Sequence, residues 1–294
     1  MAAPAPAIPL FERLLIESQS NCNRACWFCP RTYDRSGRYL DSNGAAVLHR
    51  MPTETILDLL DQAQRLDFHG WVGFHHFSEP LLDDRNLMLA AEARRRGMRP
   101  QLHTNGDVLR RDAALCREVT RLYELIVVGL YDYATNEELA EAKRYWTERL
   151  AGAARLAFSP IGIAGARSAH SVGIPKALVP SDPRMAIPDL RFAQAPCHRP
   201  LIRMIIQHNG DLCFCCEDTA NLFSLGNVFT ASLAQLWFSE SHTRAVRDLI
   251  AGMREPYVLC RNCPQSPTGP PPRGQKIDIA PRRYDGQLPL MPQP

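Results

Sequence analysis

Residues 22–29 read Cys22-Asn23-Arg24-Ala25-Cys26-Trp27-Phe28-Cys29 and place three cysteines in C-x3-C-x2-C spacing. Three thiolates are an incomplete ligand set for a 4Fe–4S cluster, which takes four protein ligands when it only transfers electrons. With three ligands, one iron stays open and can bind a small molecule. Zinc is the alternative, but it would need a distant His or Cys to close its tetrahedron. The motif therefore favours an iron–sulfur cluster with one open position.

The composition is that of an ordinary globular protein with room for one large domain and a small appended one. The 294 residues are 45% hydrophobic and 22% charged, with a formal net charge of +3. Lys and Arg are too scattered to indicate a nucleic-acid partner. No segment has the apolar length of a membrane helix, and the first residues lack the basic and apolar regions of a signal peptide. We expect a cytoplasmic protein, whose ten cysteines serve metal binding or catalysis rather than disulfides.

Residues 11–160 alternate strand-like and helix-like stretches, the pattern of βα units around a parallel sheet. The predicted strands are Arg13–Ser18, Trp71–Phe77, Gln101–Thr104, Leu125–Leu130 and Arg155–Ser159. The predicted helices are Thr53–Leu66 and Leu87–Arg96, and about Ala113–Leu122 and Asn136–Leu150. Eight units do not fit before the pattern ends. We therefore expect an α/β protein with a partial TIM barrel of the (β/α)6 type, or one unit shorter.

In such barrels the functional side chains gather in the loops that follow the strands. Here those loops contain the cysteine motif, Ser78-Glu79-Pro80, Thr104-Asn105-Gly106-Asp107 and Tyr131-Asp132. This coincidence supports both the barrel and an active site at its C-terminal end.

The barrel pattern stops at about residue 160, and a second organisation follows. Repeated prolines predict a linker over residues 161–196, and residues 197–265 form a predicted small domain. In it, Leu201–Gln207 and Asp211–Cys215 flank the turn pair Asn209-Gly210, which predicts a β-hairpin. A helical pattern follows over about Leu233–Met253. We expect residues 1–10 and the Pro- and Gly-rich tail, 266–294, to be disordered.

A second set of cysteines lies in the predicted small domain. Its four members are Cys197, Cys215, Cys260 and Cys263. They suffice for a closed 4Fe–4S cluster, although an all-cysteine set with a C-x2-C pair is also a zinc-ribbon pattern. The first motif in the same chain favours iron–sulfur. Of the remaining cysteines, Cys116 is interpreted as a buried helix residue, and Cys213 and Cys216 flank a predicted ligand.

In these motifs the chain resembles the radical S-adenosylmethionine (SAM) enzymes that carry a C-terminal twitch domain, a short form of the SPASM domain. Within that group it is most similar to aminoglycoside-pathway dehydrogenases and epimerases. The matching segments are Ser18–Pro30, Leu66–Gly70, Ser78–Leu82, Thr104–Asp107, Leu225–Val228 and Leu259–Cys263. The resemblance implies two 4Fe–4S clusters and SAM as cofactors. It also implies a small-molecule substrate and an external electron donor such as flavodoxin or ferredoxin.

The resemblance assigns roles to individual residues. The SAM cluster would be held by Cys22, Cys26 and Cys29, and the auxiliary cluster by the four cysteines of the second set. Contacts to SAM are implied for Phe28, Ser78, Glu79, Pro80, Asn105 and Tyr131, although Phe77-Ser78 replaces the two glycines of the family's Gly-Gly-Glu-Pro. Arg167 is the counterpart of an arginine that faces the substrate hydroxyl, in a different local context. Candidates by position for binding ammonium groups are Asp132, Glu217 and Asp218.

For the reaction, the resemblance implies that SAM cleavage gives a 5′-deoxyadenosyl radical, which takes hydrogen from a carbinol C–H bond of an aminocyclitol or aminosugar. We expect a dehydrogenase, in which the auxiliary cluster accepts an electron and a ketone forms. The first alternative is an epimerase, with Cys213 or Cys216 returning a hydrogen atom from the opposite face. A peptide-modifying maturase ranks third, because those enzymes usually carry a peptide-recognition domain and a larger SPASM domain. A zinc-stapled binding module ranks fourth.

Overall fold

A computed structural model describes residues 8–26, 29–131, 133, 135–161, 195–216, 218, 221–257 and 259–260. The strands are β1 (Arg13–Ile16), β2 (Trp71–Gly73), β3 (Arg99–Thr104), β4 (Leu125–Tyr131), β5 (Leu156–Ile161), β6 (Arg203–Ile206) and β7 (Leu212–Cys213). The helices are α1 (Thr53–Arg65), α2 (Asn86–Arg95), α3 (Asp107–Arg111), α4 (Ala113–Leu122), α5 (Asn136–Arg149), α6 (Arg199–Ile202), α7 (Leu233–Trp237) and α8 (Glu240–Ile250). Two short 3-10 turns, η1 (Pro30–Tyr33) and η2 (Pro80–Leu82), follow β1 and β2.

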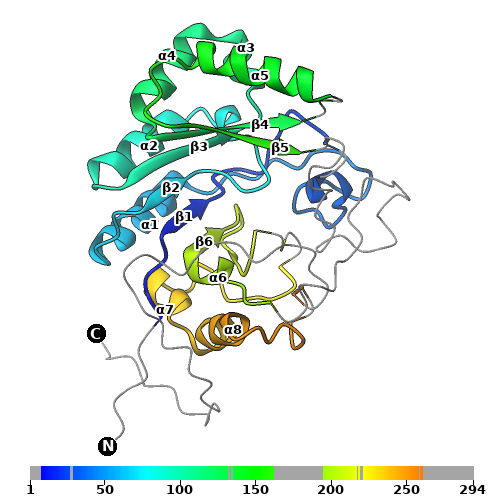
Figure 1. The fold of residues 1–294 in the computed structure, drawn as a ribbon. Helices are drawn as coiled ribbons and strands as arrows, with labels where there is room; N and C mark the ends of the chain where they lie inside the picture. The colour runs from blue at the N-terminus through cyan, green and yellow to red at the C-terminus, as the bar shows by residue number, and fades with distance from the viewer. Residues whose placement is uncertain are drawn as a thin grey trace, which may run out of the picture.

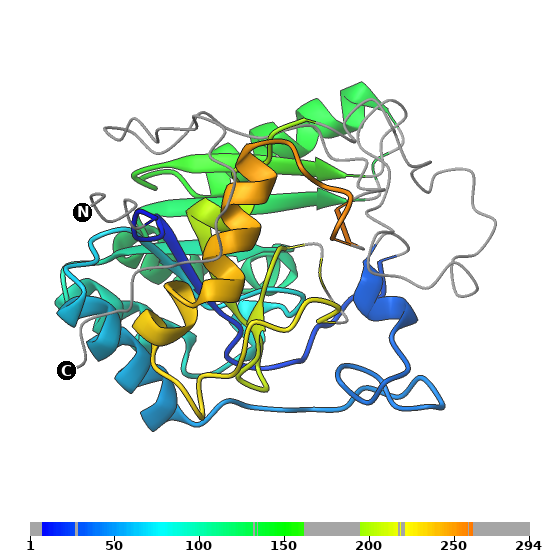
Figure 2. The same ribbon diagram turned by 90° about the horizontal axis from the view of Figure 1, so that it is seen from below.

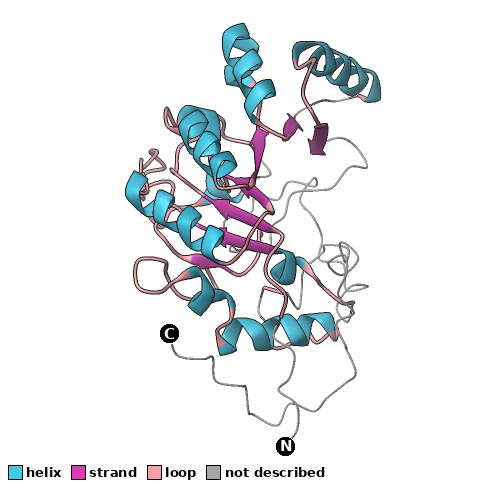
Figure 3. Cartoon of the chain, turned by 90° about the vertical axis from the view of Figure 1, so that its left-hand side faces the viewer, coloured by secondary structure: helices cyan, strands magenta, loops and turns pink. Residues whose placement is uncertain are grey.

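One seven-stranded sheet organises these elements, in the order β5-β4-β3-β2-β1-β6-β7 (Figure 1). Strands β1 to β5 are joined through helices, and each pairs in parallel with the next. Figure 3 shows helices packed along one side of these strands. The predicted α/β partial barrel is confirmed. In Figures 1 and 2 the arrows of β4 and β5 point toward the side of the molecule on which η1 lies.

The predicted hairpin is present, but its first strand extends the barrel sheet. β6 pairs in parallel with β1, with Leu14 opposite Met204 and Ile16 opposite Ile206. β7 returns antiparallel to β6. We had expected the hairpin to lie within a separate small domain, whereas its first strand is the sixth parallel strand of the barrel.

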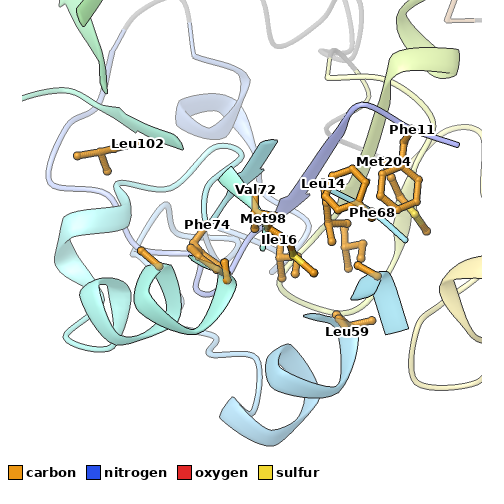
Figure 4. Close-up of a cluster of buried hydrophobic side chains, with 14 of the residues drawn as sticks. Phe11, Leu14, Ile16, Leu59, Phe68, Val72, Phe74, Met98, Leu102 and Met204 are labelled. Atoms are coloured by element: carbon orange, nitrogen blue, oxygen red, sulfur yellow. The ribbon is translucent and has the colours of Figure 1, made fainter. Parts of the chain in front are cut away.

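Alternation along the strands divides the sheet into two faces. The helix-covered face carries the main core, in which side chains from β1, β2, β3 and β6 meet those near α1 (Figure 4). Leu14, Ile16, Val72 and Met204 are completely buried there. On the other face, Leu15, Ile205 and Cys213 form a small separate cluster against which Cys216 packs. We call this second surface the inner face.

The helices begin and end close to their predicted bounds, with three differences. Helix α6 was not predicted, and Leu201 and Ile202, expected in a strand, belong to it. The single helix expected over Leu233–Met253 is two helices, because the Ser239 hydroxyl accepts a hydrogen bond from the His242 amide and caps a new start at Glu240. α3 was not predicted. It follows Gly106, whose φ of +82° is in the left-handed region that glycine adopts without strain.

Candidate active site and cysteine sets

The first cysteine set lies in the loop between β1 and η1, at the C-terminal end of the strands. Cys22, Cys26 and Cys29 are each half-buried. The Cys29 amide donates to the Cys26 carbonyl at 3.0 Å, which turns the chain toward Pro30 at the start of η1. Burial raises the pKa of Cys29 to about 12, and the neighbouring Cys26 and Cys22 raise it as well. The three cysteines therefore lie near one another in this loop.

Arg31 places a buried cation beside these sulfurs. Arg31 is only 5% exposed, and its Nε donates to the Ser20 carbonyl at 3.2 Å. Its Nη2 has no hydrogen-bond partner among the described residues. Its charge lowers the pKa of both Cys22 and Cys29, although burial outweighs it. A buried, unsatisfied guanidinium beside three thiols fits an anionic iron–sulfur cluster, whose charge would compensate the cation.

Hydrogen bonds and an ion pair between Arg24 and Asp107 join the cysteine loop to the loop after β3. The Arg24 guanidinium binds the Asp107 carboxylate through two hydrogen bonds, one of them 2.7 Å long from Nε. The Asn23 amide donates to the same carboxylate at 2.9 Å. Asn105 lies between them: its Nδ2 donates to Asn23 Oδ1 at 2.8 Å and lies 4.0 Å from Cys22 Sγ. Asn105 was a predicted site residue, whereas the Arg24–Asp107 pair was not predicted.

Glu79 joins the end of β2 to the same region. Its amide donates to the Asn21 carbonyl at 2.9 Å, directly before Cys22. Its carboxylate is 2% exposed and accepts from the Thr104 hydroxyl at 2.7 Å, from the Asn105 amide at 2.8 Å and from the Leu81 amide at 3.2 Å. Burial raises the pKa of this carboxyl to about 7, against the hydrogen bonds that lower it. Glu79 thus fixes three loops together at the predicted SAM site.

The remaining predicted SAM contacts surround this point where the structure describes them. The Ser78 hydroxyl is buried and has no hydrogen-bond partner among the described residues. Pro80 begins η2 and is buried. Tyr131 ends β4, with its ring 5.8 Å from the Arg24 guanidinium carbon, and burial raises the pKa of its hydroxyl. Phe28 lies outside the described residues.

The second cysteine set comes from three segments of the C-terminal region. The Cys197 amide donates to the Leu249 carbonyl of α8 at 2.8 Å, and the Cys260 amide donates to the Tyr257 carbonyl at 2.8 Å. The Tyr257 ring in turn stacks on Phe214 with centroids 5.9 Å apart, directly before Cys215. All three cysteines pack at the edge of the main core. Cys263 lies outside the described residues.

Neither set has the arrangement that one zinc ion would require in the part of the chain that the structure describes. Within that part, no three His, Cys, Asp or Glu side chains converge closely enough to hold a single metal ion. A cubane cluster binds its thiolates through separate irons, so they need not converge on one atom.

Cys213 and Cys216 have different environments. Cys213 is 2% exposed, and its Sγ lies 2.9 Å from the carbonyl oxygens of both Cys215 and Asp218, which share the single S–H donor. Cys216 Sγ is instead an acceptor, 3.2 Å from Arg199 Nη1 and 3.6 Å from Arg203 Nη1. Both sulfurs therefore have protein partners on the inner face.

A buried network at the top of β1 was not predicted. Glu17 is fully buried, and its carboxylate accepts from the Phe77 amide at 2.8 Å and from the Tyr39 hydroxyl at 2.9 Å. His208 Nδ1 lies 2.9 Å from the same carboxylate. These partners lower the pKa of Glu17 although burial alone would raise it. The network joins the hairpin turn to the loop that precedes Ser78.

Three predicted substrate contacts lie outside the described residues: Arg167, Asp132 and Glu217. Asp218 is described and is fully buried. Its carboxylate accepts from the Leu222 amide at 2.7 Å and from the Phe223 amide at 3.2 Å. Asp218 therefore stabilises its own loop, and the structure gives no support to its predicted contact with an ammonium group.

Comparisons with known proteins agree with this architecture. Residues 197–264 match the model of the SPASM iron–sulfur cluster-binding domain. The chain is 25% identical over 259 residues to the S-adenosyl-L-methionine-dependent 2-deoxy-scyllo-inosamine dehydrogenase of Niallia circulans, covering 86% of this chain and 93% of that protein. The structure of BtrN in complex with AdoMet and 2-DOIA is similar at a TM-score of 0.65 and 21% identity, over 87% of this chain and 94% of that one. The structure of native anSMEcpe with bound AdoMet has a TM-score of 0.54 at 12% identity, over 85% and 89% of the two chains.

Among the helices of the described residues, none is both long enough and apolar enough to span a membrane.

Proposed function

We propose that this radical SAM enzyme, which carries an iron–sulfur cluster-binding SPASM domain in its C-terminal part, oxidises a carbinol carbon of a cyclitol or sugar to a ketone. The observation that carries the proposal is the division of seven cysteines into two sets of different size. The set of three, after β1, leaves a position for SAM. The set of four, within the SPASM region, can close a second cluster with no open position, as an electron acceptor requires.

The residues present fit these cofactors. Cys22, Cys26 and Cys29 would hold the first cluster, beside the unsatisfied guanidinium of Arg31. The auxiliary cluster would be held by Cys197, Cys215, Cys260 and Cys263. When bound, SAM and its cluster supply a radical that takes hydrogen from a C–H bond, and the auxiliary cluster supplies an acceptor for the electron that the substrate then loses.

The chain's own residues would position SAM and the substrate. The unpartnered Ser78 hydroxyl and the carboxylate of Glu79 lie at the strand end directly beside the cysteine loop. A carboxylate is a strong acceptor for an ammonium group such as that of SAM. Asn105 connects this strand end to the Asn23 side chain. We therefore assign the methionine end of SAM to the region between Ser78, Glu79 and Asn105.

The dehydrogenase is favoured over an epimerase by the partners of the two remaining inner-face cysteines. An epimerase needs a thiol that delivers hydrogen to the substrate. The single S–H of Cys213 already has backbone carbonyl acceptors within 2.9 Å, and Cys216 Sγ accepts from two guanidinium groups. The name of the Niallia circulans relative, a dehydrogenase of an inosamine, supports the same reaction. As electron source we propose an external low-potential protein of the flavodoxin or ferredoxin type.

Anaerobic purification and reconstitution test the proposal, first by iron and sulfide content. About eight irons per chain are expected for two 4Fe–4S clusters. The Cys26→Ala variant should lose reductive SAM cleavage. The Cys260→Ala variant should still cleave SAM to 5′-deoxyadenosine but should form no ketone.

Three results would contradict the proposal. About four irons together with one zinc would remove the electron acceptor. Retained ketone formation in Cys260→Ala would show that the reaction does not need the auxiliary cluster as its electron acceptor. An epimerised product that disappears in Cys213→Ala or Cys216→Ala would establish the epimerase instead.

A further inference from the structure

Three histidines lie on or next to the inner face of the barrel. Val72 faces the main core, so the next residue of β2, Gly73, faces the inner face. A Cβ atom on Gly73 would lie 2.8 Å from the His75 ring and 3.1 Å from the Leu15 side chain. His75 therefore covers the inner face of β2. His103, on β3, meets it edge to face with ring centroids 5.3 Å apart. His76 follows in sequence and interacts electrostatically with Cys216.

Several polar atoms on this surface have no partner among the described residues although they are buried. They are His75 Nδ1, both ring nitrogens of His76, and the Ser78 hydroxyl. Buried polar groups in folded proteins are nearly always hydrogen-bonded to protein, water or ligand. Of these residues, Ser78 is assigned above to SAM, whereas the His75 ring lies against Gly73 and Leu15. His75 therefore offers a hydrogen-bonding position to a polar molecule on the inner face.

Two arginines lie beside His75. Arg203 lies close enough to lower the pKa of His75 and of His103, the latter to about 4, with burial as the larger cause in both. Arg13, opposite Arg203 in the sheet register, also lowers the pKa of His75. Among the described residues, Arg203 has one hydrogen-bond acceptor, Cys216 Sγ at 3.6 Å. A guanidinium carries five N–H donors, so several remain for a ligand.

Three described acidic groups act on His76, namely Glu17, Cys216 and Asp218. Glu17 accepts from Tyr39 and the Phe77 amide and lies against His208. Asp218 accepts from two amides of its own loop, and Cys216 Sγ accepts from Arg199 and Arg203. Because all three already have partners while Arg203 retains further N–H donors, the described inner face suits a negatively charged ligand better than an ammonium group.

We infer that the substrate carries an anionic oxygen group, phosphate or carboxylate, which is held on the inner face by Arg203 together with His75 and His103. The inference rests on the proposed function and specifies its substrate class. The substrate would be an acidic or phosphorylated cyclitol or sugar. An enzyme that consumes such a compound requires a preceding phosphorylation or carboxylation of the ring, or an oxidation of a primary alcohol to the acid.

Ligand binding to the reconstituted, SAM-loaded protein tests the inference without turnover. The probes are myo-inositol 1-phosphate, myo-inositol and 2-deoxystreptamine, which are anionic, neutral and cationic cyclitols, and the measurement is anaerobic isothermal titration calorimetry. We expect myo-inositol 1-phosphate to bind at least about tenfold more tightly than either of the others, because charge-assisted hydrogen bonds are available to it alone. Added sodium chloride should weaken its binding.

Variants of one arginine identify the group responsible. Arg203→Gln should lose at least about tenfold in affinity for myo-inositol 1-phosphate, and Arg203→Lys should keep part of it, because the charge remains. The matched control is Arg99→Gln, since the Arg99 guanidinium already pairs with Glu124 at 2.9 Å and should leave binding unchanged within about twofold. Circular dichroism and iron content establish that each variant is folded and loaded.

The inference is overturned if myo-inositol 1-phosphate binds no more tightly than the other two probes, including the case in which none binds. It is also overturned if Arg203→Gln, folded and loaded, binds the phosphate as the parent protein does. 5′-Deoxyadenosine formation by the same preparation, without cyclitol, separates this failure from failure of the proposed function. Absent SAM cleavage with a retained phosphate preference would count against the radical reaction and not against the anionic ligand.

Discussion

The ion pair between Arg24 and Asp107 leads to a quantitative prediction about cluster retention. The pair is bidentate, and its two side chains are 26% and 22% exposed. A charge-assisted hydrogen bond is worth about 1.5–3 kcal/mol, whereas exposed pairs contribute about 1 kcal/mol or less. For this partly exposed pair we take about 2 kcal/mol. Asp107→Asn keeps one oxygen acceptor but loses the charge, so opening of the cysteine loop should become roughly thirtyfold more favourable.

The assay is the first-order rate of iron release to a chelator from anaerobically reconstituted protein. If the loop must open before iron leaves, Asp107→Asn should lose iron roughly thirtyfold faster than the parent protein. The assay belongs at neutral pH, because Arg24 holds the pKa of Asp107 below its ordinary value of 3.8. The contribution of the pair is thus complete above that value and is lost only as the pH falls through the lower, folded pKa.

The control is a similar pair at the other end of the strands. Arg99 Nε lies 2.9 Å from Glu124 Oε2, with side chains 35% and 38% exposed. Glu124→Gln should change the rate of iron release by less than about twofold, because this pair does not touch the cysteine loop. A release rate for Asp107→Asn within about threefold of the parent would refute the reasoning, since it would show that the pair does not hold the loop closed.

Three further predictions concern stability and are measured by urea unfolding of the cluster-free chain. Gly106→Ala should cost about 4 kcal/mol, since its Cβ would lie 2.4 Å from the Trp146 ring at a φ of +82°. Gly152→Ala, at positive φ but with open space around the new Cβ, should cost only about 1 kcal/mol, and equal losses would contradict the packing argument. Burial raises the pKa of Glu79 from 4.5 to about 7, so its contribution falls as the pH rises through that window. The stability of the parent relative to Glu79→Gln should therefore drop by about 3 kcal/mol between pH 4.5 and 8, and a flat difference would be inconsistent with the raised pKa. Cys213→Ala should cost about 1 kcal/mol, because the carbonyls of Cys215 and Asp218 lose the one S–H donor that they share, and an unchanged midpoint would show that this hydrogen bond contributes nothing.

Local sequence patterns predicted the first five strands of the barrel but not that β6 is its sixth strand. The expected helix over about Ala113–Leu122 matches α4, and Leu125–Leu130 differs from β4 by one residue. These elements are determined by apolar periodicity and by capping residues close in sequence. The pairing of Arg203–Ile206 with Arg13–Ile16 joins segments 190 residues apart. No local pattern encodes such a contact, because it depends on which edge of the sheet is left unpaired.

In the candidate site, too, residues in local motifs were predicted, whereas residues that depend on distant contacts were not. Cysteine spacing identified the two sets, and the loop after β3 was recognised through Asn105. Arg31, Glu17 and the inner-face residue His103 were missed, because their importance depends on burial and on partners brought together by the fold. A signal existed at one position: two consecutive histidines, His75 and His76, stand in a segment whose alternation should have placed one of them in an apolar core.

The parallel pairing of β6 with β1 has a consequence for protein engineering. Strand β1 leads into the loop of the first cysteine set, and β6 begins the hairpin that leads to Cys215. A chain truncated before residue 197 would leave one side of β1 unpaired, and exposed edges of this kind promote aggregation. The barrel and the C-terminal region are therefore poor candidates for exchange as independent modules. A chimera should carry β6 with its original β1, and the crossover point should lie after Ile206.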